Sequence, residues 1–249
     1  MTNGKRTALI LGAYSAIAEA FGRRLSAMGY ELIIVGRRKD RLLALEKDFL
    51  ARGASSVEIQ LSDLVTDASR ADELLSVWRR NKPGKLDVVA VCHGKLTAQN
   101  TPLSVSAAAN MLDTNFKSVA LWSLAMTHHL DAKGKILILG SVAGDRGRRK
   151  NFVYGASKAG LTTLVQGINH AEPSGVTRAI LIKPGLVDTP MTDGMVKESL
   201  LWSSADDIAE VMTASLRRNR EVIYAPWFWL PIMLVIKSLP RFLFRRLDI

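Results

Sequence analysis

Short runs of apolar residues recur along the chain and alternate with longer segments in which apolar residues repeat at helical spacing. The apolar runs predict seven strands, at residues 6–11, 31–36, 57–61, 87–92, 135–139, 178–183 and 221–225. Helices are predicted between them, ending near residue 28 and covering 40–52, 67–80, a long stretch before 135, and 152–170. Strands that are apolar throughout are typical of a parallel sheet with helices on both faces. The pattern therefore predicts an α/β fold: one doubly wound domain of about seven parallel strands over residues 1–225, then a distinct segment over 226–249.

The composition fits a globular domain and narrows its chemistry. With 249 residues, 48% of them hydrophobic, the chain is long enough to bury a large core. Its single cysteine, Cys92, excludes an internal disulfide and fits a reducing compartment. One cysteine and four histidines, of which only His128 and His129 are adjacent, exclude a zinc cluster.

The charge balance is strongly basic, with 34 basic and 23 acidic residues and a formal net charge of +11. Such a chain attracts polyanions, and nucleic acid, anionic lipid and phosphorylated substrates all remain open. Residues 1–6 lead directly into the first strand without the hydrophobic region of a signal peptide. We therefore expect a cytoplasmic protein.

The turn after the first strand is a candidate phosphate-binding loop. In doubly wound sheets the first strand-to-helix turn cradles a pyrophosphate, and glycines let the backbone approach it. Residues 12–18 read Gly-Ala-Tyr-Ser-Ala-Ile-Ala, which keeps Gly12 and Ser15 but has Ala16 and Ala18 where glycines are usual. By itself the segment also fits a plain tight turn.

The end of the second strand bears on the choice of cofactor. Arg37 and Arg38 follow Gly36, where an aspartate would hold a ribose 2′-hydroxyl. Arginine accommodates a 2′-phosphate instead, so NADPH is favoured over NADH, although a solvated basic loop is the alternative. Asp63, after the third strand, is placed to meet the adenine amine, and Gly94 lets the backbone pass beside the ribose.

Tyr154 and Lys158 are the strongest candidates for chemistry. Four residues apart on a predicted helix, they project from one face. A neighbouring ammonium lowers the pKa of a phenol, which can then protonate a carbonyl oxygen while hydride reaches the carbon. The pair alone is weak, because an ordinary helix with a packed tyrosine and a solvated lysine has the same spacing. Ser141, thirteen residues before Tyr154, and Asn115 further upstream strengthen it.

These residues, in this order, resemble the short-chain dehydrogenase/reductase family. The resemblance covers residues 6 to about 225, and its most specific parts are Ser141, Tyr154 and Lys158 at their spacing and the turn Pro184–Thr189. It implies a Rossmann domain in which Tyr154 is the proton donor, Lys158 lowers its pKa and binds the nicotinamide ribose, and Ser141 bonds the substrate oxygen. It further implies that Asn115 holds a helix kink and a proton-relay water, and that the turn binds the nicotinamide carboxamide, with Thr189 as side-chain contact.

The candidate cofactor-binding residues are drawn from the carboxyl ends of the strands. They are Gly12, Tyr14, Ser15, Ala16, Ile17, Arg37, Arg38, Asp63, Leu64, Gly94, Tyr154, Lys158, Pro184, Gly185, Val187 and Thr189. The departures from the family are the two loop alanines and Val91-Cys92-His93, where Asn-Asn-Ala is usual. For His93, a hydrogen-bonding role near the cofactor is preferred to a catalytic one.

Two stretches, 144–160 and the carboxyl-terminal 222–226 with 239–247, resemble the decaprenylphosphoryl-2-keto-erythropentose reductases. That resemblance implies reduction of a keto sugar on a polyprenyl phosphate to the arabinofuranose form, after a flavin-dependent oxidase, as the second half of an epimerisation in cell-wall biosynthesis. It also implies NADH, in conflict with the two arginines.

Basic residues crowd the segment between the catalytic serine and tyrosine. Arg146, Arg148, Arg149 and Lys150 are expected near the mouth of the site, where guanidinium groups grip phosphate through paired hydrogen bonds. They are candidate ligands of a substrate phosphate, and a solvated charged loop is the alternative.

The segment 226–249 combines an apolar run with basic residues. Residues 226–236 are apolar and include two tryptophans, but the run is shorter than the ~20 residues needed to span a bilayer. Lys237, Arg241, Arg245 and Arg246 follow. This pattern favours peripheral contact with the inner face of the membrane. Packing on the sheet edge or across a dimer is the alternative.

Three functions remain open from the sequence. The first is an NAD(P)H-dependent reductase of a polyprenyl-phospho-keto sugar, and the second uses the same core on a soluble or steroid-like ketone. The third is a non-catalytic dinucleotide sensor, against which the intact Ser141, Tyr154 and Lys158 argue. A homo-oligomer through helices near 104–130 and 152–171 is implied by resemblance only. Nucleic-acid binding is not favoured, because the charge gathers at the site mouth and the terminal segment.

Overall fold

A seven-stranded sheet forms the centre of the computed structural model, which describes residues 6–80, 85–96, 103–172 and 178–247. Its order is β3-β2-β1-β4-β5-β6-β9 and every neighbouring pair is parallel. The strands are β1 (Thr7–Leu11), β2 (Glu31–Gly36), β3 (Ser56–Leu61), β4 (Leu86–Val91), β5 (Leu130–Leu139), β6 (Ala179–Pro184) and β9 (Val222–Ala225). The predicted parallel sheet is confirmed. Residues 1–5, on which the expectation about export depends, lie outside the described part.

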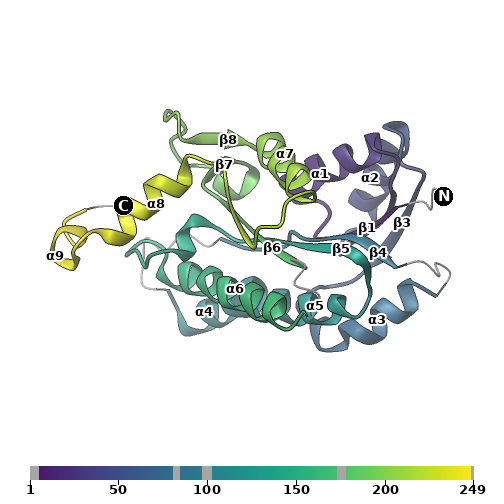
Figure 1. The fold of residues 1–249 in the computed structure, drawn as a ribbon, viewed down its shortest axis with the longest axis horizontal. Coiled ribbons are helices and arrows are strands. Elements are labelled where there is room, and N and C mark those ends of the chain that lie inside the picture. Colours follow the sequence, from purple (N-terminus) through teal and green to yellow (C-terminus); the bar gives the residue numbers. More distant parts are fainter. Residues whose placement is uncertain (1–5, 81–84, 97–102, 173–177, 248–249) are drawn as a thin grey trace.

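Helices cover both faces of the sheet (Figure 1). On one face lie α1 (Ala16–Ala27), α2 (Lys39–Ala51) and α7 (Ala205–Ser215). On the other lie α3 (Ala71–Trp78), α4 (Val105–Leu112), α5 (Ser118–Thr127) and α6 (Phe152–His170).

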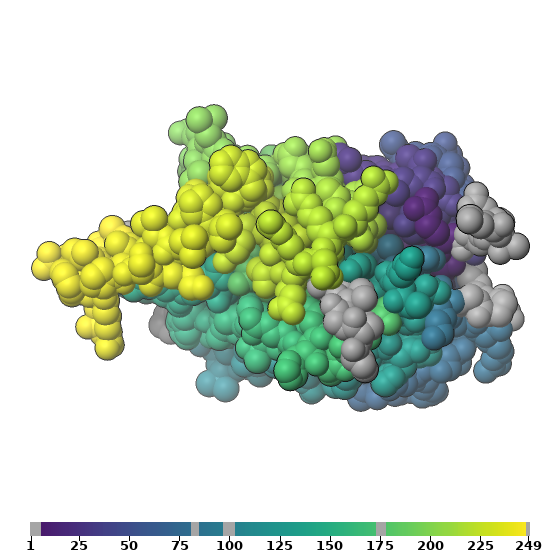
Figure 2. Space-filling view, viewed as in Figure 1, coloured from purple at the N-terminus to yellow at the C-terminus, as the bar shows by residue number. Residues whose placement is uncertain are grey.

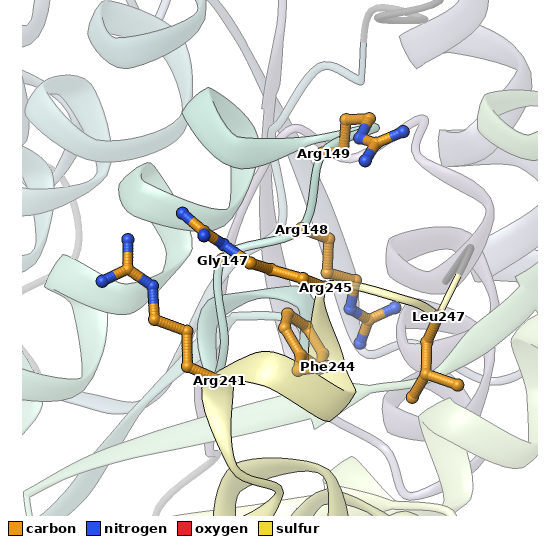
Figure 3. Close-up of a pocket in the computed structure, with 7 residues that line it drawn as sticks. All are labelled: Gly147, Arg148, Arg149, Arg241, Phe244, Arg245 and Leu247. Carbon is orange, nitrogen blue, oxygen red and sulfur yellow. The ribbon is translucent and has the colours of Figure 1, made fainter.

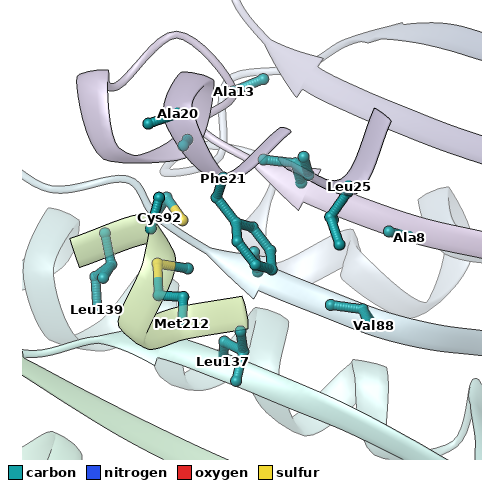
Figure 4. Packing of buried hydrophobic residues seen from close by; sticks show 14 of the residues in the cluster. Ala8, Ala13, Ala20, Phe21, Leu25, Val88, Cys92, Leu137, Leu139 and Met212 are labelled. Carbon is teal, nitrogen blue, oxygen red and sulfur yellow. The ribbon is translucent and has the colours of Figure 1, made fainter. Parts of the chain in front are cut away.

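The two faces explain why the strands are apolar throughout. Ala8 and Ile10 of β1 belong to the core under α1 and α7, whereas Leu9 and Leu11 belong to the core under α3, α5 and α6. Successive side chains of a strand point to opposite faces, so a strand buried on both faces needs apolar residues at every position. Figure 4 shows the first core, where Phe21 of α1 packs above the sheet.

Three elements, two short strands and helix α7, escaped the sequence analysis. β7 (Leu186–Asp188) and β8 (Trp202–Ser204) form a second, two-stranded parallel sheet beyond the end of β6. Helix α7 follows, with Ser204 accepting a hydrogen bond from the Asp207 amide while Asp207 accepts one from the Ser204 amide. This capping box was a readable signal in the sequence.

The carboxyl-terminal segment forms two further helices, α8 (Trp229–Ser238) and α9 (Arg241–Phe244). They project from one end of the molecule (Figure 2, yellow). Because α8 follows β9, it lies at the edge of the sheet where the parallel strands end. Among the described residues, no helix is both long enough and apolar enough to cross a membrane.

Candidate active site

The turn after β1 is shaped to receive an anion. Gly12 has a φ of +75°, and a Cβ there would lie 2.8 Å from the backbone nitrogen of His93. Ser15 caps α1 by accepting a hydrogen bond from the Ala18 amide. The first-turn amides of a helix have no intrahelical acceptor, so those of Ala16 and Ile17 are available to a phosphate. The two alanines leave this geometry intact.

The end of β2 places two arginines beside that turn. The Arg37 amide donates to the Tyr14 hydroxyl at 3.2 Å, which ties the ends of β1 and β2 together. The Arg37 side chain pairs with Asp63 at 3.2 Å and Arg38 pairs with Asp40 at 2.7 Å. Both guanidinium groups are well exposed, at 66% and 62% of the side chain. Exposed ion pairs are weak, so both arginines can turn to a phosphate.

Asp63 is held by backbone amides. Its Oδ1 accepts from the amides of Val65 at 2.9 Å and Thr66 at 3.4 Å, while Oδ2 faces Arg37. Although partial burial acts in the opposite direction, these amides and the guanidinium hold the pKa of Asp63 below its ordinary value. It stays an anionic acceptor, as contact with an adenine amine requires.

His93, which replaces the family alanine, is tied to the opposite helix layer. Ser118 donates its hydroxyl proton to the Leu64 carbonyl at 2.5 Å, so its oxygen is left to accept from His93 Nε2 at 2.9 Å. That assigns the imidazole proton to Nε2 and leaves Nδ1 as a buried acceptor without a partner in the described part. Burial, with a smaller contribution from Lys158, lowers the pKa of His93 to about 3. The residue is a neutral structural link.

Asn115 lies in a π-helical turn, Asp113–Lys117, which joins α4 to α5. Its side chain is fully buried and bonds both backbone groups of Lys95, at 2.8 and 2.7 Å. Such single π turns bend helices and often occur at functional sites. A Cβ at Gly94 would lie 3.0 Å from Asn115 Oδ1 and 3.7 Å from Lys158 Nζ, so only glycine leaves this space open.

Ser141 and Tyr154 are brought together at the end of β5. Ser141 caps a short 3₁₀ turn, Val142–Gly144, by accepting from the Ala143 amide at 3.1 Å. Burial raises the pKa of Tyr154 to about 12, and a hydrogen bond with Ser141 acts in the opposite direction. Tyr154 is therefore a protonated phenol at neutral pH, ready to donate.

The Lys158 side chain lies near the Tyr154 ring. Its Nζ donates to the Leu139 carbonyl at 2.8 Å and lies 5.8 Å from the centre of the Tyr154 ring. Burial lowers the pKa of Lys158 to about 8, opposed by the neighbouring Cys92. The expected lowering of the Tyr154 pKa by this ammonium differs from what the structure gives, because burial dominates and the ammonium is turned to a carbonyl.

The turn after β6 is covered by the first turn of α8. The Trp229 indole packs over Gly185, where an added Cβ would overlap it. The indole Nε1–H is buried and has no acceptor among the described residues. A buried donor without a partner, placed on the turn expected to hold a carboxamide, suits an oxygen acceptor from a ligand. At the other end of the turn, Thr189 and Thr192 bond each other at the start of a 3₁₀ turn.

The four basic residues after Ser141 fall into two groups, those that line a surface cleft and those that do not. Arg146 donates to the carbonyls of Ile236 and Lys237 at the end of α8, and Arg148 contacts the Met233 sulfur at 3.8 Å. Arg148 and Arg149 line a surface cleft from which Arg146 and Lys150 are absent.

A buried polar group anchors the start of that loop. Asp145 accepts from Lys183 Nζ at 2.5 Å and from the Tyr224 hydroxyl at 2.6 Å. The side chains of Lys183 and Asp145 are only 6% and 2% exposed. β6 and β9 therefore fix the backbone of the loop that follows Ser141.

Comparison with known proteins identifies the family. Residues 6–199 match the short chain dehydrogenase family. The chain belongs to it. It is an NAD(P)-dependent oxidoreductase, and the glycine turn, the free amides of α1 and the orphaned indole donor fit such a cofactor.

The relatives give the class of enzyme without a substrate. The dehydrogenase is 31% identical to an "uncharacterized oxidoreductase" of Streptomyces coelicolor over 97% of this chain and 96% of that one. It is 28% identical to one of Mycobacterium tuberculosis over 98% of both. A short chain dehydrogenase from Burkholderia cenocepacia in complex with NADP superposes with a TM-score of 0.77, at 23% identity over 90% of this chain and 97% of that one.

Contacts between distant segments escaped the sequence analysis. Trp229 over Gly185, Arg146 at the end of α8, and Cys92 beside Lys158 each join residues more than forty positions apart. No local pattern reports such contacts.

Proposed function

We propose that the dehydrogenase uses NADPH to reduce a keto sugar carried on a polyprenyl phosphate, of the 2-keto-erythropentose to arabinofuranose type, after a flavin-dependent oxidase. The observation that supports this substrate is the meeting of an arginine-rich loop with an apolar, basic helical segment beside the turn at Gly185. A phosphate joined to an apolar chain matches both surfaces.

The site residues account for reduction of a carbonyl. A bound nicotinamide cofactor would supply the hydride for the carbonyl carbon. Tyr154 would give its phenolic proton to the carbonyl oxygen, so that the ketone becomes a secondary alcohol. Ser141, which opposes the effect of burial on the Tyr154 pKa, would orient that oxygen. Lys158, held by the Leu139 carbonyl, is the neighbouring cation that stabilises the phenolate as the proton leaves.

The proposed preference for NADPH rests on Arg37 and Arg38. Both lie at the end of β2 with exposed guanidinium groups and form only surface ion pairs. A 2′-phosphate would compete for them with Asp63 and Asp40. The NADP complex of the Burkholderia dehydrogenase, a structural neighbour, is consistent with this preference.

Peripheral membrane contact, at the inner face, is part of the proposal. The outer face of the terminal segment exposes Trp227 at 77%, Leu234 at 57%, Val235 at 62% and Phe242 at 64%. Lys237 and Arg246 flank them. Apolar side chains beside cations favour an anionic bilayer surface. A lipid-linked substrate would then reach the site without leaving the membrane.

Assembly into a homo-oligomer is proposed through the helices on the α6 side of the sheet. Leu124 of α5 and Phe152 of α6 are 56% and 57% exposed there. Sedimentation at several protein concentrations tests this assembly.

A second candidate, reduction of a soluble ketone, is favoured by one observation. Trp229 and Met233 are buried against Val142 at the edge of the sheet, so α8 has a structural role independent of lipid. In that case the terminal helices would close the substrate site without binding a membrane.

The test compares NADPH consumption on an extracted polyprenyl-phospho-2-keto-pentose with that on simple ketones of similar size. A kcat/KM at least ten times higher on the lipid-linked sugar is expected. Equal or better use of the simple ketones would favour the second candidate. Trp227→Ser and Leu234→Ser, which alter only the exposed face, should weaken sedimentation with anionic vesicles.

A further inference from the structure

A cleft of about 270 Å³ lies between the loop after Ser141 and helix α9, separate from the catalytic residues. The loop and the helix contribute to it in nearly equal measure. The lining residues are Gly147, Arg148, Arg149, Arg241, Phe244, Arg245 and Leu247. Figure 3 shows Arg241 and Arg245 extending to one side of α9, with Arg148 on the other side of Phe244 and Arg149 beyond it.

The lining is cationic and lacks an internal counter-charge. In the described part of the chain, none of the four arginines forms an ion pair, and no carboxylate lines the cleft. Asp145, which interacts electrostatically with Arg148, already accepts from Lys183 and Tyr224. Elsewhere, arginines such as Arg24 and Arg178 are paired with carboxylates.

One of these arginines, Arg148, is half-buried, and its buried Nε is incompletely bonded. Arg148 Nε has no hydrogen-bond partner among the described residues, and Nη2 reaches only the Met233 sulfur. Burying a cation without a strong acceptor is unfavourable, and an anion bound in the cleft relieves that cost.

The cleft is held in shape by a neighbour that does not line it. Arg146 binds the carbonyls of Ile236 and Lys237, the groups that a helix leaves unsatisfied at its carboxyl end. The same guanidinium lies 3.8 Å from the centre of the Phe244 ring. Loop and helix are thus fastened together before any ligand arrives.

Apolar groups stand beside the cations. Phe244 and Leu247 line the cleft, and Phe242 and Leu243 of the same helix are 64% and 41% exposed. A purely hydrophilic anion has no use for these side chains. An amphiphilic one places its head on the arginines and its chain along α9.

We propose that this cleft binds the phosphate group of an amphiphilic phosphate ester, with Arg241 and Arg245 completing a site that Arg148 and Arg149 begin. Identification of that ester as the substrate itself rests on the proposed function. A membrane phospholipid offers the same chemistry, and the experiment separates the two sources.

The test measures binding of four probes to the full chain: farnesyl phosphate, farnesol, inorganic phosphate, and phosphatidylcholine vesicles with or without phosphatidylglycerol. Farnesyl phosphate is expected to bind at least tenfold more tightly than farnesol or inorganic phosphate. Arg149→Gln, Arg241→Gln and Arg245→Gln should each weaken it roughly tenfold, the usual scale for a lost charge-assisted hydrogen bond. Arg218→Gln, which removes the same charge at an exposed position outside the lining and the terminal segment, should change it less than twofold.

The outcomes separate the sources and the two proposals. If the cleft variants lose binding of farnesyl phosphate but keep binding of phosphatidylglycerol vesicles, the result supports a lipid phosphate substrate. If they lose binding of phosphatidylglycerol vesicles but keep binding of farnesyl phosphate, it supports a site for a phospholipid headgroup. Equal loss in Arg218→Gln, or unchanged binding of every phosphate probe in the three cleft variants, overturns the site. Melting temperature and NADPH affinity show that each variant is folded. If the cleft fails while the phospho-keto sugar is still reduced, the proposed function survives; if the cleft holds and the sugar is not reduced, only the function falls.

Discussion

The buried floor of the site and its basic rim are built in opposite ways. On the floor, Lys158 and Asn115 each bond a backbone group, and His93 reaches one through Ser118. On the rim, Arg149 and Arg245 are exposed and unpaired in the described part. Buried polar groups need hydrogen-bond partners within the protein, whereas exposed cations are solvated and remain available to bind a ligand. Under the proposed function, the buried residues would carry the reaction and the exposed arginines would select the substrate.

The sharpest test of this division is Tyr154→Phe. Loss of the phenolic proton should lower kcat for ketone reduction by roughly 10²- to 10⁴-fold, the usual contribution of general acid catalysis. NADPH affinity, measured by quenching of tryptophan fluorescence, should change little. Full turnover by this variant would show that Tyr154 is not the proton donor.

The boundary between floor and rim is tested at Gly185 and Trp229. An added Cβ in Gly185→Ala would overlap the indole and should destabilise the fold by about 1–3 kcal/mol. Trp229→Ala should cost about 3–5 kcal/mol through the cavity it leaves. In the double variant the alanine at 185 should cost almost nothing further, since the overlapping ring is gone. Denaturant unfolding measures all three, and additive costs would mean that the two residues do not touch in solution.

The sheet could be predicted because it depends on local patterns, whereas the roles of Ser141, Tyr154 and Lys158 stay predictions. Apolar runs located the seven strands of the main sheet, and the helical pattern of residues 152–170 located α6, which carries Tyr154 and Lys158. β7 and β8 escaped because three residues are too few to show a period. The contact between Arg146 and Ile236 depends on how α8 packs, which no sequence spacing reports. Burial likewise set the pKa of Tyr154 against the expectation from its neighbour.

The buried residue His93 should make the free energy of unfolding depend on pH in the acid range. The folded chain keeps His93 neutral down to a pKa of about 3, while the unfolded chain binds a proton below the ordinary value of 6.5. Between these values the unfolded state holds more protons, so stability is complete above about 6.5 and falls as the pH drops, by up to about 1.4 kcal/mol per unit. His93→Gln, which can still donate to Ser118 and cannot titrate, should flatten that part of the profile. An unchanged slope between pH 6.5 and 4 would show that His93 is not buried in solution.

The smallest expected effect concerns Arg37. Its side chain is exposed like those of the cleft arginines, but it already forms an ion pair with Asp63. Arg37→Ala would delete the proposed ligand of the 2′-phosphate and the ion pair with Asp63, which keeps its bonds to the Val65 and Thr66 amides. The KM for NADPH should therefore rise roughly tenfold, the effect of losing one charge-assisted hydrogen bond, while that for NADH changes less than about twofold. Arg70→Ala, which removes an equally exposed arginine paired with Glu73, is the matched control and should affect neither cofactor. Equal changes in the two KM values would mean that Arg37 and Arg38 do not select the cofactor and only interact with solvent. Ligand selection by arginines would then be confined to the cleft formed with α9.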